Sequence, residues 1–116
     1  MKVTYIKHSC FVIEWEDCIW IFDYWKGSLP KMDGDKKVFV FGSHRHDDHF
    51  NPDIVKNLKD YPRVEYILSD DIRFRDQNKI TRLAPGECYE TGDGAGNSIV
   101  VRTFPSTDCG VAFLIT

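Results

Sequence analysis

Six consecutive residues, His44-Arg45-His46-Asp47-Asp48-His49, hold three of the four histidines of the chain and two carboxylates. They follow the apolar run 38–41 and the pair Gly42-Ser43. Imidazole nitrogen and carboxylate oxygen are ligands by which proteins bind zinc, iron and manganese, and a short loop after a strand presents several of them to one point. The cluster therefore predicts a metal site. The alternative is a solvated polar loop that happens to be rich in histidine.

The spacing within the cluster indicates which of its residues could bind the same metal ion. In an extended chain, residues two apart point to the same side, so His44 and His46 can reach one ion. Asp48 and His49 are adjacent and diverge in an extended chain. A turn that opens a helix at Asn51-Pro52-Asp53 would bring both toward a second position nearby. The spacing is therefore compatible with two metals.

The cluster, set between an apolar strand and a helix, resembles the H-x-H-x-D-H signature of the metallo-beta-lactamase superfamily. The four positions of the signature are His44, His46, Asp48 and His49. Upstream, residues 3–14 and 19–23 look like the opening strands of the zinc-dependent hydrolase subgroup, whose third strand ends in an aspartate. The resemblance covers essentially the whole chain.

The resemblance implies an α+β fold, mainly an antiparallel sheet with few helices, like the N-terminal part of the superfamily's αββα sandwich. It implies one or two zinc ions, with iron or manganese as alternatives, placing His44 and His46 on the first and Asp48 and His49 on the second. The expected activity is hydrolysis of an ester, lactone, amide or phosphodiester in a small-molecule substrate by metal-activated water, which Asp48 would hold and orient as the catalytic residue.

The downstream sequence departs from the superfamily pattern. A third histidine is usual in a segment resembling P-G-H-T-x-G, but Ser106 stands at that place within residues 104–110. Because a serine hydroxyl is a poor zinc ligand, water, Asp108, Cys109 or another group would have to complete the first site. The superfamily's bridging aspartate and last histidine would follow Thr116.

Two further residues are auxiliary candidates. By resemblance, Asp23 at the end of an apolar strand run would lie beneath the metals and orient a ligand histidine. The alternative is an aspartate that faces water at a strand end. His8, in a strand connection, is either a structural or exposed histidine or a cleft residue near the metals.

The remaining sequence predicts strands and few helices. The expected strands are 3–6, 10–15, 18–24, 38–41, 64–68, 80–83, 88–91, 98–104 and 111–115, the first three forming an antiparallel meander. One helix is expected within 51–59, and the polar segment 70–78 is a candidate for a short helix. The glycine-rich stretch 92–97 predicts a hairpin connection, not a phosphate loop, because no lysine and helix follow it. The loop 24–37 is either a wall of a substrate cleft or a plain surface connection.

Composition limits the partners. A formal net charge of −3, with 28% charged residues, supplies no basic field for nucleic acid. No apolar stretch reaches membrane-spanning length and no signal peptide begins the chain, so a cytoplasmic location is expected. The four cysteines lack C-x-x-C spacing and are expected to be free thiols, with Cys10 and Cys109 as small buried side chains.

Length favours a single domain over residues 1–116. The apolar strand 111–116 at its end leads us to expect the N-terminal half of a longer hydrolase, truncated relative to the superfamily. Half of a sandwich leaves an apolar sheet face, so a second copy of the chain or the missing C-terminal half is expected to cover it. The competing hypothesis is a non-catalytic metal-binding or structural fragment with an incomplete site.

Overall fold

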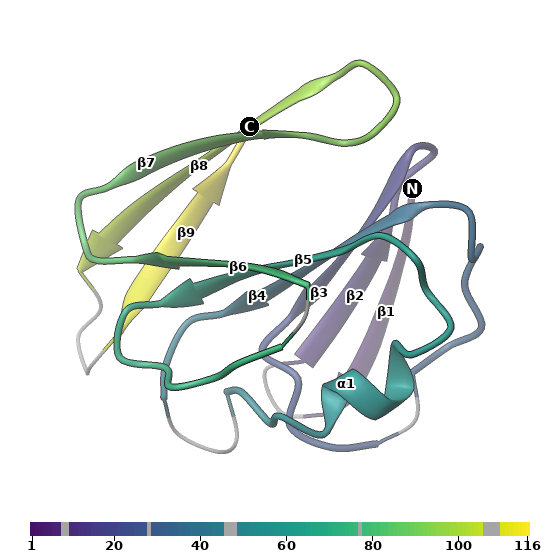
Figure 1. Ribbon diagram of the computed structural model, residues 1–116, viewed down its shortest axis with the longest axis horizontal. Helices are drawn as coiled ribbons and strands as arrows, with labels where there is room; N and C mark the ends of the chain where they lie inside the picture. The colour runs from purple at the N-terminus through teal and green to yellow at the C-terminus, as the bar shows by residue number, and fades with distance from the viewer. Residues whose placement is uncertain (8–9, 28, 46–48, 77, 106–109) are drawn as a thin grey trace.

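The computed structural model describes residues 1–7, 10–27, 29–45, 49–76, 78–105 and 110–116. Their secondary structure is almost entirely strand, as Figure 1 shows. The elements are β1 (Lys2–Lys7), β2 (Cys10–Glu14), β3 (Cys18–Phe22), β4 (Lys37–Gly42), α1 (Ile54–Asn57), β5 (Val64–Ser69), β6 (Lys79–Leu83), β7 (Cys88–Gly92), β8 (Ser98–Pro105) and β9 (Val111–Ile115). The expected α+β class with little helix is confirmed.

The strands form two sheets. The larger has the order β1-β2-β3-β4-β5-β6 and the smaller the order β7-β8-β9. The meander β1-β2-β3 is antiparallel, as the sequence predicted, and so is the smaller sheet. From β3 to β6 the larger sheet is parallel, so the carboxyl ends of β3, β4 and β5 meet at one edge. This edge carries the candidate site.

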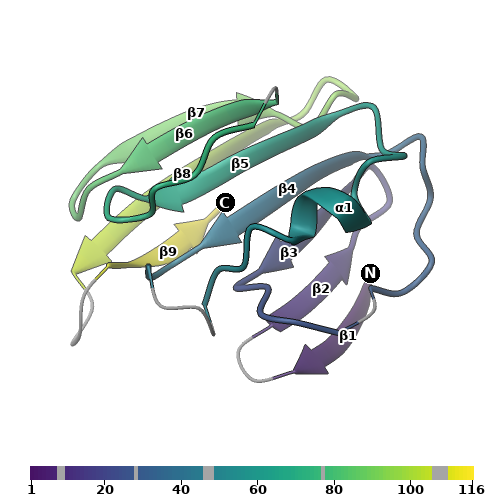
Figure 2. The ribbon, with the colours of Figure 1, turned by 60° about the horizontal axis from the view of Figure 1, so that its bottom comes forward.

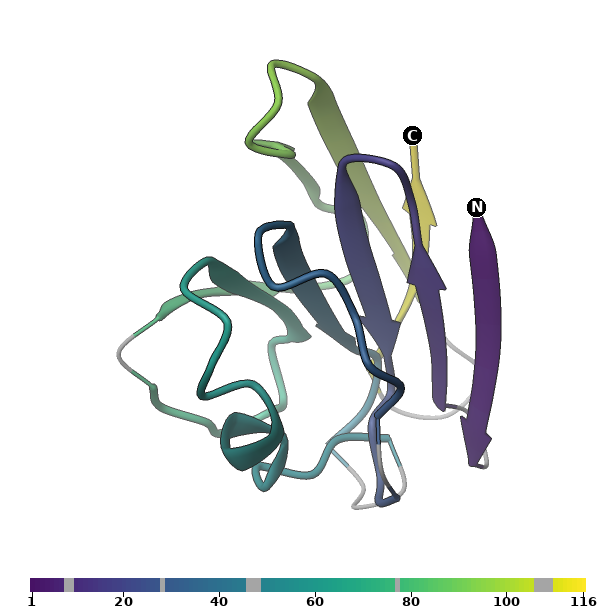
Figure 3. The ribbon, with the colours of Figure 1, turned by 90° about the vertical axis from the view of Figure 1, so that its right-hand side faces the viewer.

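Strand β4 separates two hydrophobic cores because its side chains alternate between the faces of the sheet. Val38 and Val40 pack in the core that includes Ile54 of α1. Phe39 and Phe41 pack in the core that joins the two sheets. Figures 2 and 3 show α1 on one side of the larger sheet and β7–β9 on the other. Every side chain from Val38 to Phe41 is fully buried, which holds the end of β4 in a fixed place.

A buried carboxylate also joins the sheets. Glu65 of β5 is 3% exposed and accepts hydrogen bonds from Tyr89 Oη at 2.8 Å and Thr91 Oγ1 at 3.0 Å, both on β7. Lys37 Nζ forms an ion pair with Glu65 Oε1 at 3.1 Å and donates to the carbonyl of Gly92 at 2.9 Å. Each oxygen of this buried charge therefore has a partner, which burial requires.

One helix prediction is confirmed over a shorter range and the other is wrong. The helix expected within 51–59 is present as Ile54–Asn57, and Asn51 forms a turn before its start by accepting from the Asp53 amide. No helix is present among the described residues of 70–78. Ile72 and Phe74 are buried and Arg73 is exposed, which is the two-residue period of extended chain.

Arg82 explains why residues 72–76 are extended. Its guanidinium donates to the carbonyl oxygens of Ile72, at 3.0 Å, and Phe74. These are carbonyls that a helix would use for its own ladder. The glycine-rich stretch 92–97 does connect the antiparallel strands β7 and β8, as predicted.

The described cysteines are free thiols, as expected. Cys10 and Cys18 are buried and Cys88 is exposed, whereas Cys109 lies outside the described residues. Burial, with a smaller effect of the Asp23 charge, raises the pKa of Cys10 to about 12. The Cys10 thiol therefore stays protonated at neutral pH and acts as a small buried side chain.

Apolar side chains remain exposed on β1 and β2. Tyr5 and Phe11 pair across these strands, with ring centroids 5.1 Å apart, and are 59% and 41% exposed. That a second copy or a C-terminal half covers such a face stays a prediction. Among the described residues, no helix is long and apolar enough to span a bilayer.

Replacing Glu65 with alanine should lower the free energy of unfolding by about 3 kcal/mol, because Lys37 and the β7 hydroxyls lose their buried acceptor. Urea unfolding followed by circular dichroism measures the change. The matched control is Asp53→Ala, which removes an ion pair with 84% and 68% exposed side chains and should cost less than about 0.5 kcal/mol. Equal losses in both variants would contradict a buried junction at Glu65.

Candidate metal centre

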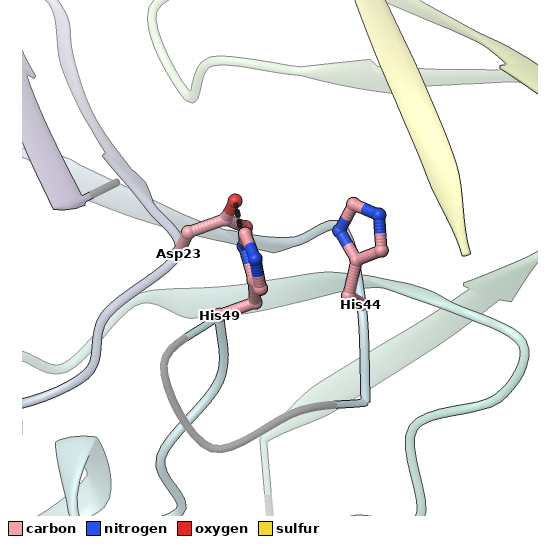
Figure 4. Close-up of side chains that lie close together, drawn as sticks. All are labelled: Asp23, His44 and His49. Carbon is pink, nitrogen blue, oxygen red and sulfur yellow. Dashed lines mark hydrogen bonds and ion pairs between the residues drawn. The ribbon is translucent and has the colours of Figure 1, made fainter. Parts of the chain in front are cut away.

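The candidate centre is built where β3 and β4 end side by side. Asp23 directly follows β3, and Ser43 and His44 directly follow β4. The Asp23 amide donates to the Phe41 carbonyl at 2.8 Å, so the parallel ladder continues to the first residue of the site. Figure 4 shows Asp23, His44 and His49 facing one region from three segments of the chain.

Asp23 is the hydrogen-bond acceptor at the base of this region. Its φ of +49° is left-handed, a conformation that aspartate adopts more readily than most residues. Its Oδ1 accepts from the Ser43 amide at 2.8 Å, and its Oδ2 accepts from Ser43 Oγ at 2.6 Å. His49 Nδ1 lies 3.1 Å from the same Oδ2. One carboxylate thus holds both the end of β4 and the far end of the histidine-rich loop.

These hydrogen bonds assign the tautomers of both imidazoles. Ser43 Oγ donates its single proton to Asp23, because a carboxylate only accepts, and so it accepts from His44 Nδ1 at 2.7 Å. His49 Nδ1 likewise donates to Asp23. Both rings therefore carry their acceptor lone pair on Nε2, which is the form in which a neutral imidazole binds a metal.

The described donors lie close together and are of types that bind transition metals. One ligand atom from each of Asp23, His44 and His49 lies within 4.8 Å of the others. The two imidazole rings have centroids 4.5 Å apart at an interplanar angle of 41°. Two nitrogens and a carboxylate at the end of a strand are a combination found around zinc, iron and manganese.

The residues after His49 are fixed by the loop that follows β3. The Asn51 amide donates to the Tyr24 carbonyl at 2.9 Å, and Asn51 Nδ2 donates to the Trp25 carbonyl at 2.6 Å. Phe50 is 4% exposed and packs in the core beside α1. The first residues of the loop 24–37 therefore support the candidate centre. From sequence, this loop was either a cleft wall or a plain surface connection.

The smaller sheet touches the centre through Gly110. A Cβ on this residue would lie 2.0 Å from the Ser43 carbonyl oxygen, and its φ of +84° disfavours any side chain. The next amide, that of Val111, donates to the same carbonyl at 2.8 Å. Only glycine permits this approach, which joins the start of β9 to the residue that bridges Asp23 and His44.

The structure thus brings together three of the residues predicted from sequence: Asp23, His44 and His49. The others, His8, His46, Asp48, Ser106 and Asp108, lie outside the described residues. Sequence reasoning missed Ser43 and Gly110. Their only signals were local: a small polar residue between a strand and a histidine, and a glycine just before an apolar run.

A comparison with models of protein families assigns the chain to a family. Residues 2–108 match the model of the beta-lactamase superfamily domain. The chain belongs to this superfamily. The predicted resemblance to the metallo-beta-lactamase superfamily is therefore confirmed, and no curated protein matches the chain in addition.

Ten chains of known structure match this beta-lactamase superfamily member. One is Igni18, described as a novel metallo hydrolase from the hyperthermophilic archaeon Ignicoccus hospitalis KIN4/I. The two share 16% sequence identity at a TM-score of 0.65, over 98% of the present chain and 55% of Igni18. The present chain therefore spans about half the length of that protein, and at this identity the likeness shows the fold.

Replacing Gly110 with alanine should lower the free energy of unfolding by about 2 kcal/mol or more, because the new Cβ overlaps the Ser43 carbonyl in a left-handed backbone. Thermal and urea unfolding measure the change. Gly34→Ala is the matched control, since no atom lies within 4 Å of its added Cβ, and should stay within about 0.5 kcal/mol. A Gly110→Ala protein as stable as wild type would refute the close approach.

Proposed function

We propose that this chain is a single metallo-beta-lactamase-like domain of a metal-dependent hydrolase. The observation that carries the proposal is the network in which Asp23 and Ser43 hold the imidazoles of His44 and His49 in their metal-binding tautomer. A solvated loop rich in histidine has no need of a half-buried carboxylate that holds one ring directly and the other through Ser43. The superfamily membership supports the hydrolytic class.

The residues that would hold the ions are His44, His46, Asp48 and His49, from the motif at the end of β4. Asp23 would act mainly as the carboxylate that orients His49, because both of its oxygens already accept hydrogen bonds from the protein. Zinc, or alternatively iron or manganese, as one or two bound ions would lower the pKa of water toward neutrality and polarise the oxygen under attack.

The side chains have separate tasks in the proposed reaction. Asp48 would accept a hydrogen bond from the attacking water and hold it in line with the substrate. Ser43 would keep the His44 ring from rotating, since its hydroxyl links that ring to Asp23. The substrate would be a small molecule with an ester, lactone, amide or phosphodiester bond.

The metal proposal is tested by metal analysis of protein purified without added metal, using plasma mass spectrometry. Wild type should retain zinc, iron or manganese, whereas His44→Ala and His49→Ala should each retain much less because an imidazole ligand is lost. Asp60→Ala, at an exposed carboxylate, is the control and should match wild type. Equal metal content in all four proteins would refute a site at this loop.

Asp23→Asn should weaken zinc binding by about 10- to 100-fold, because the amide is a poorer acceptor for His49 and Ser43 but suits the same backbone conformation. Competition with a chromophoric chelator measures the affinity. The fold should remain, so circular dichroism of the variant should match wild type. Unchanged affinity would remove Asp23 from its orienting role.

Hydrolysis is tested with 4-nitrophenyl esters, lactones and bis(4-nitrophenyl) phosphate on metal-loaded protein. Turnover per bound metal ion that falls sharply in Asp48→Ala, with the fold retained, would support the proposed reaction. Metal binding without any hydrolysis would instead favour the non-catalytic metal-binding fragment.

A further inference from the structure

A pocket of about 440 Å³ lies beside the candidate metal centre. It is lined by Arg45, Phe50, Pro52, Asp71, Ile72 and Arg73. Pockets that hold small-molecule ligands have volumes of roughly 300 to 1,000 Å³. The pocket is therefore large enough to hold part of a substrate.

The topology places this pocket at the edge of the sheet that carries the candidate centre. Strands β4 and β5 are parallel, and Gly42 pairs with Leu68, so the chain leaves both strands at the same edge. Arg45 directly follows His44, and Phe50 directly follows His49. Consecutive Cα atoms are only about 3.8 Å apart, so each of these pocket residues lies next to an imidazole of the candidate centre. Residues beside the two imidazoles therefore form one wall of the pocket.

The apolar part of the pocket lining packs closely against Gly42. A Cβ there would lie 2.9 Å from Ile72 and 3.1 Å from Phe50. Both of these side chains line the pocket and are otherwise buried, so they give it a packed apolar surface. Such a surface with a few polar groups around it is the usual composition of a ligand site.

The charged groups leave the pocket positive. Two guanidiniums and one carboxylate line it, +2 and −1, which gives +1 in a chain whose formal net charge is −3. Within the described part of the chain, neither Arg45 nor Arg73 has a carboxylate partner. A guanidinium binds carboxylate or phosphate oxygens through paired N–H donors. One anionic group would neutralise the pocket.

We propose that this pocket binds the anionic end of the substrate. Arg45 and Arg73 bind a carboxylate or phosphate group. The substrate class is then an ester or lactone that carries a free anionic group. The catalytic part of this inference rests on the proposed hydrolase function, whereas the binding part does not.

Binding is tested by calorimetric titration of glutarate and of inorganic phosphate into wild type, Arg45→Ala and Arg73→Ala at equal metal content. The dissociation constant of at least one anion should rise about tenfold in each variant, and the tighter anion identifies the preferred group. Arg73 lies outside the histidine-rich loop, so its variant separates anion binding from damage to the loop. Arg75→Ala, which removes a nearby arginine that does not line this pocket, should stay within about twofold of wild type. Anion affinities equal in all four proteins would overturn the proposal.

Hydrolysis is compared on a matched pair of esters, mono-4-nitrophenyl glutarate and 4-nitrophenyl pentanoate, which differ by the terminal carboxylate. The charged ester should have the higher kcat/KM in wild type, and Arg73→Ala should abolish the difference. Anion binding that depends on the arginines without hydrolysis of either ester supports the pocket and refutes esterase activity. Equal hydrolysis of both esters, with no arginine dependence, supports the hydrolase and overturns the pocket.

Discussion

The candidate centre depends on one carboxylate. Asp23 accepts hydrogen bonds from the backbone and hydroxyl of Ser43 and from the ring of His49. These donors come from the end of β4 and from the loop before α1, so a single residue after β3 sets the distance between three segments. Because the carboxylate only accepts, it also determines which nitrogen of each imidazole carries the proton. The positions of the two imidazole rings, and the nitrogen that carries the proton in each, are thus fixed by the same few hydrogen bonds.

The rest of the fold keeps that carboxylate and its donors in place. β3 and β4 are adjacent parallel strands, and the side chains of β4 enter two separate cores. Aromatic side chains reinforce this pair, since the Phe22 and Phe41 rings stack with centroids 4.8 Å apart. Rotation or slippage of β4 would break packing on both faces of the sheet at once. The parallel strands also bring the β5–β6 connection, with Asp71 and Arg73, to the same edge.

The features that could be predicted from sequence were those set by residues close together in the chain. Runs rich in β-branched and aromatic residues predicted the strands, and six adjacent residues predicted the metal site and the family. The contacts between distant residues could not be predicted, because Ser43 and Asp23 are 20 positions apart and meet only through strand pairing.

Glu65 lies in an apolar run of the sequence, and its burial is explained only by its hydrogen bonds to residues of β7. Segment 70–78 was a helix candidate by polarity, but Arg82 binds the carbonyls of Ile72 and Phe74, where the chain is extended. The short α1 shows the same limit, since Asn51 forms a turn where its polarity indicated a helix start.

The contact between Gly110 and Ser43 has a thermodynamic consequence. The Ser43 carbonyl receives the Val111 amide while its hydroxyl connects Asp23 with His44, so docking of the smaller sheet and ordering of the imidazoles share one residue. Any coupling between the two is reciprocal: if docking of the smaller sheet raised the affinity of the proposed site for an ion, the ion would stabilise the docked sheet by the same free energy. Under such coupling, a partner that binds β9 would act as an effector of the candidate centre without contacting it.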